Sequence, residues 1–285
     1  MGLPPKPEHI SNIEFIRILS PYIFIQGMVG GKSVLDIGCG FGHGAWLLAS
    51  NGAKQVVTVD LDKIKTLRVQ GICSNLKNFN TLVMDAQRLG FKDHSFQVIT
   101  CFEVIEHIPK PEVVLSEIRR LLKTDGVLLL TTPNRAVRLL PFQPPWNKEH
   151  LREYTLRSFR KTLQRHFPSF ELLGIYGEPR LHKHYKDIWK QKPIHFYFGF
   201  IILMIRRLMP ARVKRWITNQ LNGGKQKGSP FASTDLLHNM PSVTDHENWP
   251  FHLGDLDEDY LNFFVICSFD DHVVQRSIRE IRRAP

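Results

Sequence analysis

Carboxylates and glycines follow three apolar segments in the first part of the chain. Residues 36–42 read Asp-Ile-Gly-Cys-Gly-Phe-Gly, and Asp60 and Asp85 each stand at the end of a later apolar run. Glycines at such a turn let a ligand approach the main chain closely. A carboxylate that ends the second strand can accept hydrogen bonds from both hydroxyls of a ribose, and Asp85 could accept one from an adenine amino group. This spacing predicts a ligand that contains a nucleoside.

The acidic character of these positions indicates which nucleoside. Carboxylates would repel a pyrophosphate but suit a cofactor that carries cationic groups and no phosphate. The dinucleotide fingerprint also fits poorly, because His43 stands where its third glycine belongs. We therefore predict S-adenosylmethionine as the cofactor, rather than NAD or FAD.

The elements that would position these residues alternate along the first 176 residues. Short apolar runs predict strands, and amphipathic stretches predict the helices between them. The predicted strands are 33–37, 55–60, 80–84, 96–101, 127–132 and 171–176. Strands separated by helices imply parallel crossovers in an open, doubly wound α/β sheet. Ligands of such sheets bind beyond the carboxyl ends of the strands, where the glycine turn, Asp60 and Asp85 all fall.

Four regions follow from the pattern. We predict an N-terminal helix in residues 1–30, a cofactor-binding core in 31–176, a basic and partly apolar helical insertion in 177–258, and a last strand with a basic tail in 259–285. The aromatic run from Tyr260 to Phe269 would return to the sheet as its seventh strand. The expected fold is thus a mostly parallel, seven-stranded sheet interrupted before its last strand.

Five motifs in this order resemble the class I S-adenosylmethionine-dependent methyltransferases. They are residues 35–42 (Leu-Asp-Ile-Gly-Cys-Gly-Phe-Gly), 58–60 (Thr-Val-Asp), 85–86 (Asp-Ala), 101–107 (Cys-Phe-Glu-Val-Ile-Glu-His) and 122–126 (Leu-Lys-Thr-Asp-Gly). The pattern is similar to that of ubiquinone-biosynthesis O-methyltransferases and related small-molecule, lipid and glycan enzymes. The resemblance covers about residues 31 to 176. It implies the Rossmann-like methyltransferase fold and is more specific for the cofactor than for the acceptor.

The resemblance also implies roles for individual residues. Asp36 would orient the glycine turn and approach the amino group of the cofactor. Gly38, Gly40 and Gly42 would contact its methionine and ribose part. Asp60 would hold the ribose, with Leu61 against the adenine; Asp85 and Ala86 would read the adenine edge, and Phe102 would border the pocket. The alternative is that Asp60 or Asp85 merely caps the helix that follows.

The acceptor side centres on His150. Phe102-Glu103-Val104-Ile105 replaces the Asn-Pro-Pro-Tyr motif of enzymes that methylate base amines, which disfavours that reaction. Residues 147–155 (Asn-Lys-Glu-His-Leu-Arg-Glu-Tyr-Thr) are similar to acceptor-side loops of lipid- and glycan-modifying relatives. His150 could serve as a general base, because histidine titrates near neutral pH, while Trp146 and Tyr154 could stack on a ring. Alternatively, Glu153 and Thr155 only start the next helix and His150 is exposed.

His107 is the second candidate catalytic residue. Glu103, Glu106 and His107 would share one face if their segment were helical, and with His150 they could hold Mg²⁺ or a similar ion. Similar motifs bind a divalent metal in some ubiquinone-pathway enzymes and in small-RNA 2′-O-methyltransferases. Relatives with this motif also work without a metal, in which case Glu106 and His107 would brace the loop through hydrogen bonds.

The formal net charge of +11 favours an anionic partner. Residues 188–234 contain nine Lys or Arg and no Asp or Glu, and residues 194–205 are mostly apolar but too short to span a bilayer. An apolar run beside arginines suits an anionic membrane surface. It equally suits a helix that lids the active site, and a basic stripe is also the footprint of nucleic-acid binding, although no separate RNA-binding module is evident.

These observations favour an O-directed methyltransferase acting on a small-molecule, lipid-linked or glycan acceptor. The alternatives are an RNA 2′-O-methyltransferase and a non-catalytic, cofactor-binding regulatory protein. The four cysteines form no Cys-x-x-Cys pair, which argues against a zinc knuckle or a redox dithiol. The first nine residues lack the features of a secretory signal. We therefore expect a cytoplasmic protein, peripheral on the inner membrane surface if the insertion binds lipid.

Overall fold

The computed structural model describes residues 12–139, 143–145, 147–183, 185, 250–256 and 260–283. Most of the predicted insertion, with its apolar and arginine-rich stretches, lies outside the described residues, as does Trp146. Among the described residues, no helix is both long and apolar enough to cross a membrane.

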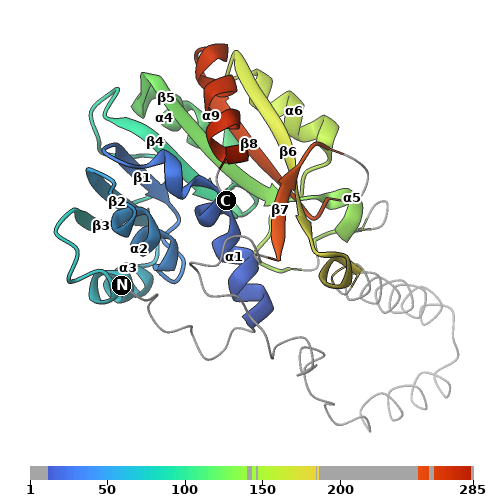
Figure 1. Cartoon of the computed structure of the whole chain (residues 1–285), viewed down its shortest axis with the longest axis horizontal. Helices are drawn as coiled ribbons and strands as arrows, with labels where there is room; N and C mark the ends of the chain where they lie inside the picture. The colour runs from blue at the N-terminus through green and yellow to red at the C-terminus, as the bar shows by residue number, and fades with distance from the viewer. Residues whose placement is uncertain are drawn as a thin grey trace, which may run out of the picture.

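A single twisted sheet forms the centre of the molecule (Figure 1). Its strands run in the order β3-β2-β1-β4-β5-β8-β6-β7. The pairs among β1 to β5 are parallel, whereas β8 is antiparallel to both β5 and β6. In chain order the strands are Ser33–Ile37, Gln55–Asp60, Phe79–Val83, Phe96–Phe102, Leu122–Pro133, Ser169–Gly177, Phe251–Gly254 and Asn262–Ser268.

The sheet has eight strands rather than the seven predicted. The additional strand is β7, which pairs antiparallel with the outer edge of β6 from Gly174 to Gly177. It comes from the region predicted as a helical insertion, and its four residues are too few to show a periodic pattern. The predicted last strand is confirmed as β8, which lies between β5 and β6.

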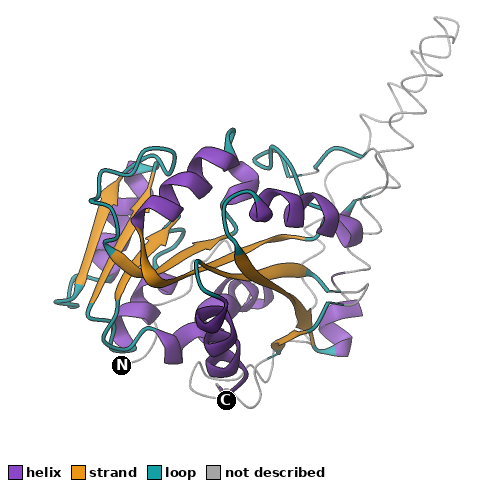
Figure 2. Cartoon of the chain, turned by 90° about the horizontal axis from the view of Figure 1, so that it is seen from above, coloured by secondary structure: helices purple, strands orange, loops and turns teal. Residues whose placement is uncertain are grey.

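Helices cover both faces of the sheet (Figure 2). Residues of α1, α2, α3 and α9 belong to one apolar cluster, and residues of α4 and α6 belong to a second cluster on the opposite face. Neighbouring strand residues contribute to opposite clusters: Val34 to the first and Leu35 to the second. This alternation is why the parallel strands read as continuous apolar runs. The helices are α1 (Asn12–Ile25), α2 (His43–Ser50), α3 (Lys63–Ile72), α4 (Pro111–Leu121), α5 (Arg135–Arg138), α6 (Leu156–Gln164) and α9 (Asp271–Arg283), with 3-10 turns η1 (Gln26–Met28) and η2 (Ile105–His107).

Local sequence sets where the helices near the site begin. The Asp62 carboxylate accepts hydrogen bonds from the backbone N–H groups of Ile64 and Lys65 and so caps α3. Pro111 occupies the first turn of α4, where its missing N–H is no loss. Thr155 caps α6 in a reciprocal pair with Ser158. These residues fix where the helices begin. The carboxyl ends of the parallel strands meet along one edge of the sheet.

Candidate active site

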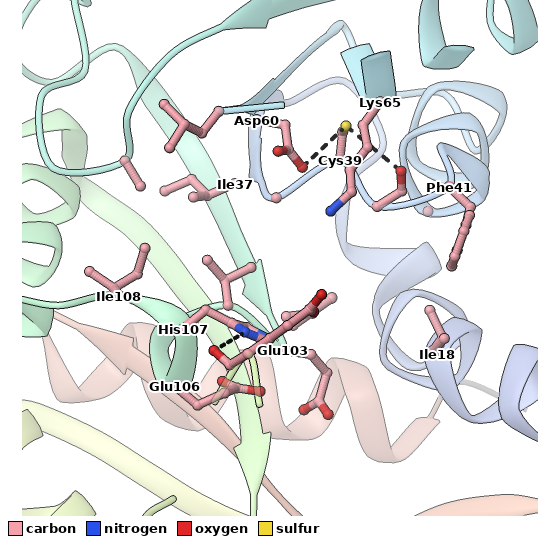
Figure 3. Close-up of a pocket in the computed structure, with 18 of the residues that line it drawn as sticks. Ile18, Ile37, Cys39, Phe41, Asp60, Lys65, Glu103, Glu106, His107 and Ile108 are labelled. Carbon is pink, nitrogen blue, oxygen red and sulfur yellow. Dashed lines mark hydrogen bonds between the residues drawn. The ribbon is translucent and has the colours of Figure 1, made fainter. Parts of the chain in front are cut away.

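One cavity of about 990 Å³ opens at the carboxyl ends of the parallel strands. Asp60 and Cys39 lie on one side of it, and Glu103, Glu106 and His107 lie on the other (Figure 3). Apart from Asp36, every predicted cofactor residue lines the cavity, as do both candidate catalytic histidines. The fold thus brings together predicted site residues that are up to 112 positions apart in the sequence, from Gly38 to His150.

The glycine turn forms the wall next to β1. Gly38 has φ +87°, and a Cβ atom there would lie 2.4 Å from the Cγ2 atom of Val104. Only glycine satisfies both conditions, because L-residues avoid this backbone region and the space is occupied. Gly40 also has a positive φ, of +49°, but nothing lies within 4 Å of its Cβ position. The main chain at Gly40 is therefore open to a bound molecule.

Asp60 is held at the end of β2 by two hydrogen bonds. Its Oδ1 atom accepts from the Asp62 backbone N–H at 2.9 Å, and its Oδ2 atom accepts from the Cys39 thiol at 3.4 Å. The side chain that caps α3 is that of Asp62, so Asp60 does not serve as the N-cap of that helix. Each Asp60 oxygen has capacity for a further donor, which is what a ribose diol would require.

The residues predicted to surround the adenine lie beside Asp60 in the same cavity. Leu61 lines the cavity and is 71% exposed, so its apolar surface is open to a flat ring. The Asp85 carboxylate accepts hydrogen bonds from the Gln87 backbone N–H at 2.9 Å and from the Gln87 side-chain amide at 3.4 Å, and it has capacity for a further donor. Ala86 is buried. The Phe102 ring also lines the cavity and stands edge-on to the Tyr22 ring, with the ring centroids 4.8 Å apart.

Asp36 lies beneath the glycine turn and does not line the cavity. Its side chain is fully buried and accepts hydrogen bonds from the hydroxyls of Tyr22, Thr58 and Thr100 at 3.1, 3.0 and 2.7 Å. Burial raises the pKa of Asp36 to about 6, against the opposing effect of these hydroxyl donors. The structure is consistent with Asp36 supporting the turn, and it does not bring the carboxylate to the cavity wall.

His107 faces the cavity from the short η2 turn. Its Nδ1 atom donates to the Glu149 carbonyl oxygen at 2.9 Å, which leaves the Nε2 lone pair available. Burial lowers the pKa of His107, so the ring is neutral at neutral pH. The His150 ring stands edge-on to it, with the ring centroids 4.7 Å apart.

His150 is not an exposed residue next to a helix start. Its side chain is only 6% exposed, and its Nδ1 atom lies 2.9 Å from the Oε1 atom of the fully buried Glu153. Thr155 does start α6, as the alternative interpretation held, but Glu153 does not take part in that cap. Tyr154 is buried outside the cavity lining, where it packs against Phe159.

Glu106, His107 and His150 bring one ligand atom each to within 4.8 Å of one another. The Oε1 atom of Glu106 is buried with no hydrogen-bond partner among the described residues, while its Oε2 atom accepts from Thr132 at 3.0 Å. Burial, and then the nearby Glu103 carboxylate, hold the pKa of Glu106 well above its usual range. An orphaned buried oxygen beside two imidazoles with satisfied Nδ1 atoms fits a divalent cation.

The expectation that Glu103 shares a helical face with these residues is wrong. Glu103 has φ +56°, and the helical turn begins only at Ile105. Its carboxylate turns away, accepting from Thr131 and Asn262 at Oε1 and from Arg17 at Oε2. Glu103 therefore does not join the cluster, which among the described residues consists of Glu106, His107 and His150.

The sequence interpretation missed several charged residues at the acceptor end of the cavity. Arg17 of α1 binds Glu14 at 2.7 Å and Glu103 at 3.1 Å. A signal for this pair was present in the sequence. Glu14 and Arg17 are the two charged residues of an otherwise mostly apolar helix, and they stand one helical turn apart. Arg138 and Tyr185 also line the cavity. No local pattern marks either of them.

The doubly wound sheet and a cavity lined by a glycine turn and two carboxylates are features of a nucleoside-binding fold. A family model described as a methyltransferase domain matches residues 17–174, more than half of the chain. The chain belongs to this family and contains a class I S-adenosylmethionine-dependent methyltransferase domain.

Named relatives agree with this assignment. A ubiquinone biosynthesis O-methyltransferase of Xanthomonas oryzae is 34% identical over 135 residues, which cover 46% of this chain and 54% of the relative. A probable S-adenosylmethionine-dependent methyltransferase of Mycobacterium tuberculosis is 30% identical over 173 residues, covering 60% of this chain and 62% of the relative. The chain thus spans about half the length of the ubiquinone-pathway relatives. The solved structure of a Thermotoga maritima methyltransferase has the same fold, with a TM-score of 0.54, 14% identity, and coverage of 90% of this chain and 91% of that one.

The residues present fit this cofactor. The main chain at Gly40 is accessible, carboxylates with spare acceptor capacity stand at Asp60 and Asp85, and Leu61 offers an apolar surface between them. When bound, S-adenosylmethionine supplies an activated methyl group. The chain has only to hold the cofactor and align an acceptor.

Proposed function

We propose that this protein transfers the methyl group to an oxygen of a small-molecule, lipid-linked or glycan acceptor. The observation that carries the proposal is that one cavity holds the cofactor-binding residues at one end and a histidine pair at the other. An oxygen acceptor usually needs a base, and a neutral imidazole can take its proton near neutral pH. The printed names of the ubiquinone-pathway relatives support an oxygen acceptor.

In this proposal His150 takes the acceptor proton and His107 orients the acceptor beside it. Both rings have Nδ1 engaged by a neighbouring oxygen, so each presents Nε2 as the atom available for the acceptor. Asp60 and Asp85 hold the ribose and adenine, and the turn at Gly38 and Gly40 carries the methionine end.

A labelled-methyl assay on lipid, polysaccharide and RNA fractions tests the acceptor class. We expect label in the lipid or polysaccharide fraction, as a methyl ether that survives treatment with alkali. Label confined to RNA would favour 2′-O-methylation, and no label in any fraction from a protein that binds the cofactor would favour a regulatory role.

Two variants separate the ends of the cavity. Asp60→Ala should weaken binding of S-adenosylhomocysteine by at least about tenfold, because two ribose hydrogen bonds to a charged group are lost. His150→Gln should retain that affinity and lose turnover by about 10²-fold or more. Calorimetry and the labelled-methyl assay measure the two effects. Unchanged affinity in the first variant, or wild-type turnover in the second, would contradict the assigned role.

Glu106, His107 and His150 are also suited to hold a divalent cation. Such an ion would supply Lewis-acid stabilisation of the acceptor oxygen. Treatment with EDTA should then abolish turnover, and Mg²⁺ should restore it. Turnover that is indifferent to chelation would contradict a metal requirement and leave the proton transfer to the side chains of the cluster alone.

A further inference from the structure

Glu153 is a wholly buried carboxylate that lies outside the cavity and contacts a residue that lines it. Its Oε1 atom is 2.9 Å from Nδ1 of His150 and 3.3 Å from Nε of Arg138. None of its side chain is exposed. Burying an ionised carboxylate costs free energy unless it is paired, and His150 and Arg138 are the groups that contact this one.

The backbone directly after Glu153 is fixed. The carbonyl oxygen of Tyr154 accepts from the Arg135 N–H at 2.9 Å, and Tyr154 forms an isolated parallel bridge with Asn134. Thr155 then caps α6. The carboxylate is therefore presented from a rigid part of the loop, which is the condition for positioning another side chain.

The hydrogen-bond chemistry around Glu153 permits one tautomer of a neutral His150. An ionised carboxylate only accepts hydrogen bonds, so the proton of the ring must reside on Nδ1, and Nε2 carries the lone pair. His150 belongs to the cluster in which ligand atoms of Glu106, His107 and His150 lie within 4.8 Å of one another. With Nδ1 bound to Glu153, Nε2 is the ring nitrogen that remains available to that cluster.

The geometry points to Glu153 as the positioning residue of His150: its carboxylate fixes the tautomer and the orientation of the ring. The lone pair of Nε2 is thereby kept at the acceptor end of the cavity, whether it receives a proton or binds a cation. The consequence for catalysis rests on the proposed function, whereas the tautomer is a property of the protein alone.

Substitution by leucine is a sharp probe, because it removes both acceptor oxygens with little change in size. Nδ1 of His150 and Nε of Arg138 face the same Oε1 atom of Glu153. In Glu153→Leu there is no acceptor at that position, so the proton of the neutral His150 ring is no longer held on Nδ1. In Glu153→Gln the amide oxygen can accept from both donors there, so this variant keeps the Nδ1–H tautomer and loses only the charge.

The tautomer can be read directly by ¹⁵N NMR of histidine-labelled protein in EDTA, with His150→Gln identifying the signal. We expect Nδ1–H in the wild type and in Glu153→Gln, and a shift towards Nε2–H in Glu153→Leu. A wild-type ring protonated on Nε2, or an unchanged tautomer in Glu153→Leu, would overturn the assignment. The wild-type spectrum alone decides the matter if the variant does not fold.

Kinetics then test the consequence. Turnover of Glu153→Leu should fall by about 10²-fold or more, with the KM for S-adenosylmethionine unchanged. Glu153→Gln keeps an acceptor for Nδ1 of His150 and should recover part of this loss. Glu112→Leu is the control, because Glu112 also contacts a histidine and an arginine, His166 at 2.6 Å and Arg165 at 3.2 Å, away from the cavity and with its side chain 43% exposed. It should leave turnover unchanged.

The outcomes separate the two levels of the argument. Wild-type turnover in Glu153→Leu while His150→Gln is inactive would overturn the positioning role. Equal losses in Glu153→Leu and Glu112→Leu would reduce the effect to general destabilisation and overturn it as well. Wild-type turnover in His150→Gln would instead remove the proposed base, and the NMR result would then report on Glu153 independently.

Discussion

Asp36, the buried carboxylate beneath the cofactor turn, makes the stability of the folded protein depend on pH. Its pKa rises from 3.8 in the unfolded chain to about 6 in the folded protein, because burial disfavours the charged form. The folded state therefore binds this proton more tightly than the unfolded chain. Above pH 6 the folded protein has to hold a buried charge whose three hydroxyl donors offset only part of the cost.

The sign of the resulting pH dependence follows. The contribution of Asp36 to the free energy of unfolding should fall by about 2 kcal/mol as pH rises from about 4 to about 7. In Asp36→Asn this component is absent, so the stability of the variant relative to wild type should increase over the same range. Denaturant unfolding of both proteins at the two pH values measures it. A stability difference that is independent of pH would show that the pKa of Asp36 is close to its usual value.

At the scale of elements, the crossing of α1 and α2 determines where the cofactor turn sits. Gly44 of α2 packs against the ring of Tyr22, and a Cβ atom at Gly44 would lie 2.1 Å from that ring. The Tyr22 hydroxyl also donates to Asp36. The two helices can therefore approach closely only because α2 has no side chain at this point.

We expect Gly44→Ala to destabilise the protein by about 1–3 kcal/mol, because overpacking outweighs the gain of about 0.5–1 kcal/mol in helix propensity. Thermal or denaturant unfolding measures the change. Gly71→Ala in α3 is the matched control, since nothing lies within 4 Å of its Cβ position, and it should be stabilising by about 0.5–1 kcal/mol. Equal effects of the two substitutions would mean that the crossing tolerates a methyl group.

At the scale of the whole molecule, the basic and apolar stretch of residues 194–216 is the feature with the largest consequence for location. We expect the chain to float with vesicles that contain anionic lipid. Each basic residue near such a surface contributes about 1 kcal/mol, so replacing four arginines by glutamine should weaken partitioning by about 10²- to 10³-fold. The four are Arg206, Arg207, Arg212 and Arg215.

A control with the same loss of charge distinguishes a local site from net charge. Its four exposed positions lie in α6 and α9, and it should float like the wild type: Arg157, Arg160, Arg276 and Arg279. Equal weakening in both variants would assign the effect to overall charge. Failure to float, with salt-sensitive retention on RNA, would favour the RNA 2′-O-methyltransferase instead.

Much of the fold and of the cofactor end was predictable from the sequence, because both depend on short-range patterns. Six strands and the helices between them follow from periodicity, within a few residues at each end. Once those strands are parallel, their carboxyl ends must share an edge. Gly38, Asp60 and Asp85 then come together without any knowledge of side-chain contacts.

The acceptor end was decided by tertiary structure. Glu103 leaves the metal cluster because Arg17, Thr131 and Asn262, from three distant elements, take its carboxylate. The sequence pattern offers Glu153 only an alternative role at a helix start, yet its side chain lies buried between His150 and Arg138. The sequence by itself determined which segments would form and which of their ends would meet. The choice of partner for each buried charge depends on contacts between residues far apart in the chain, and no local pattern encodes those contacts.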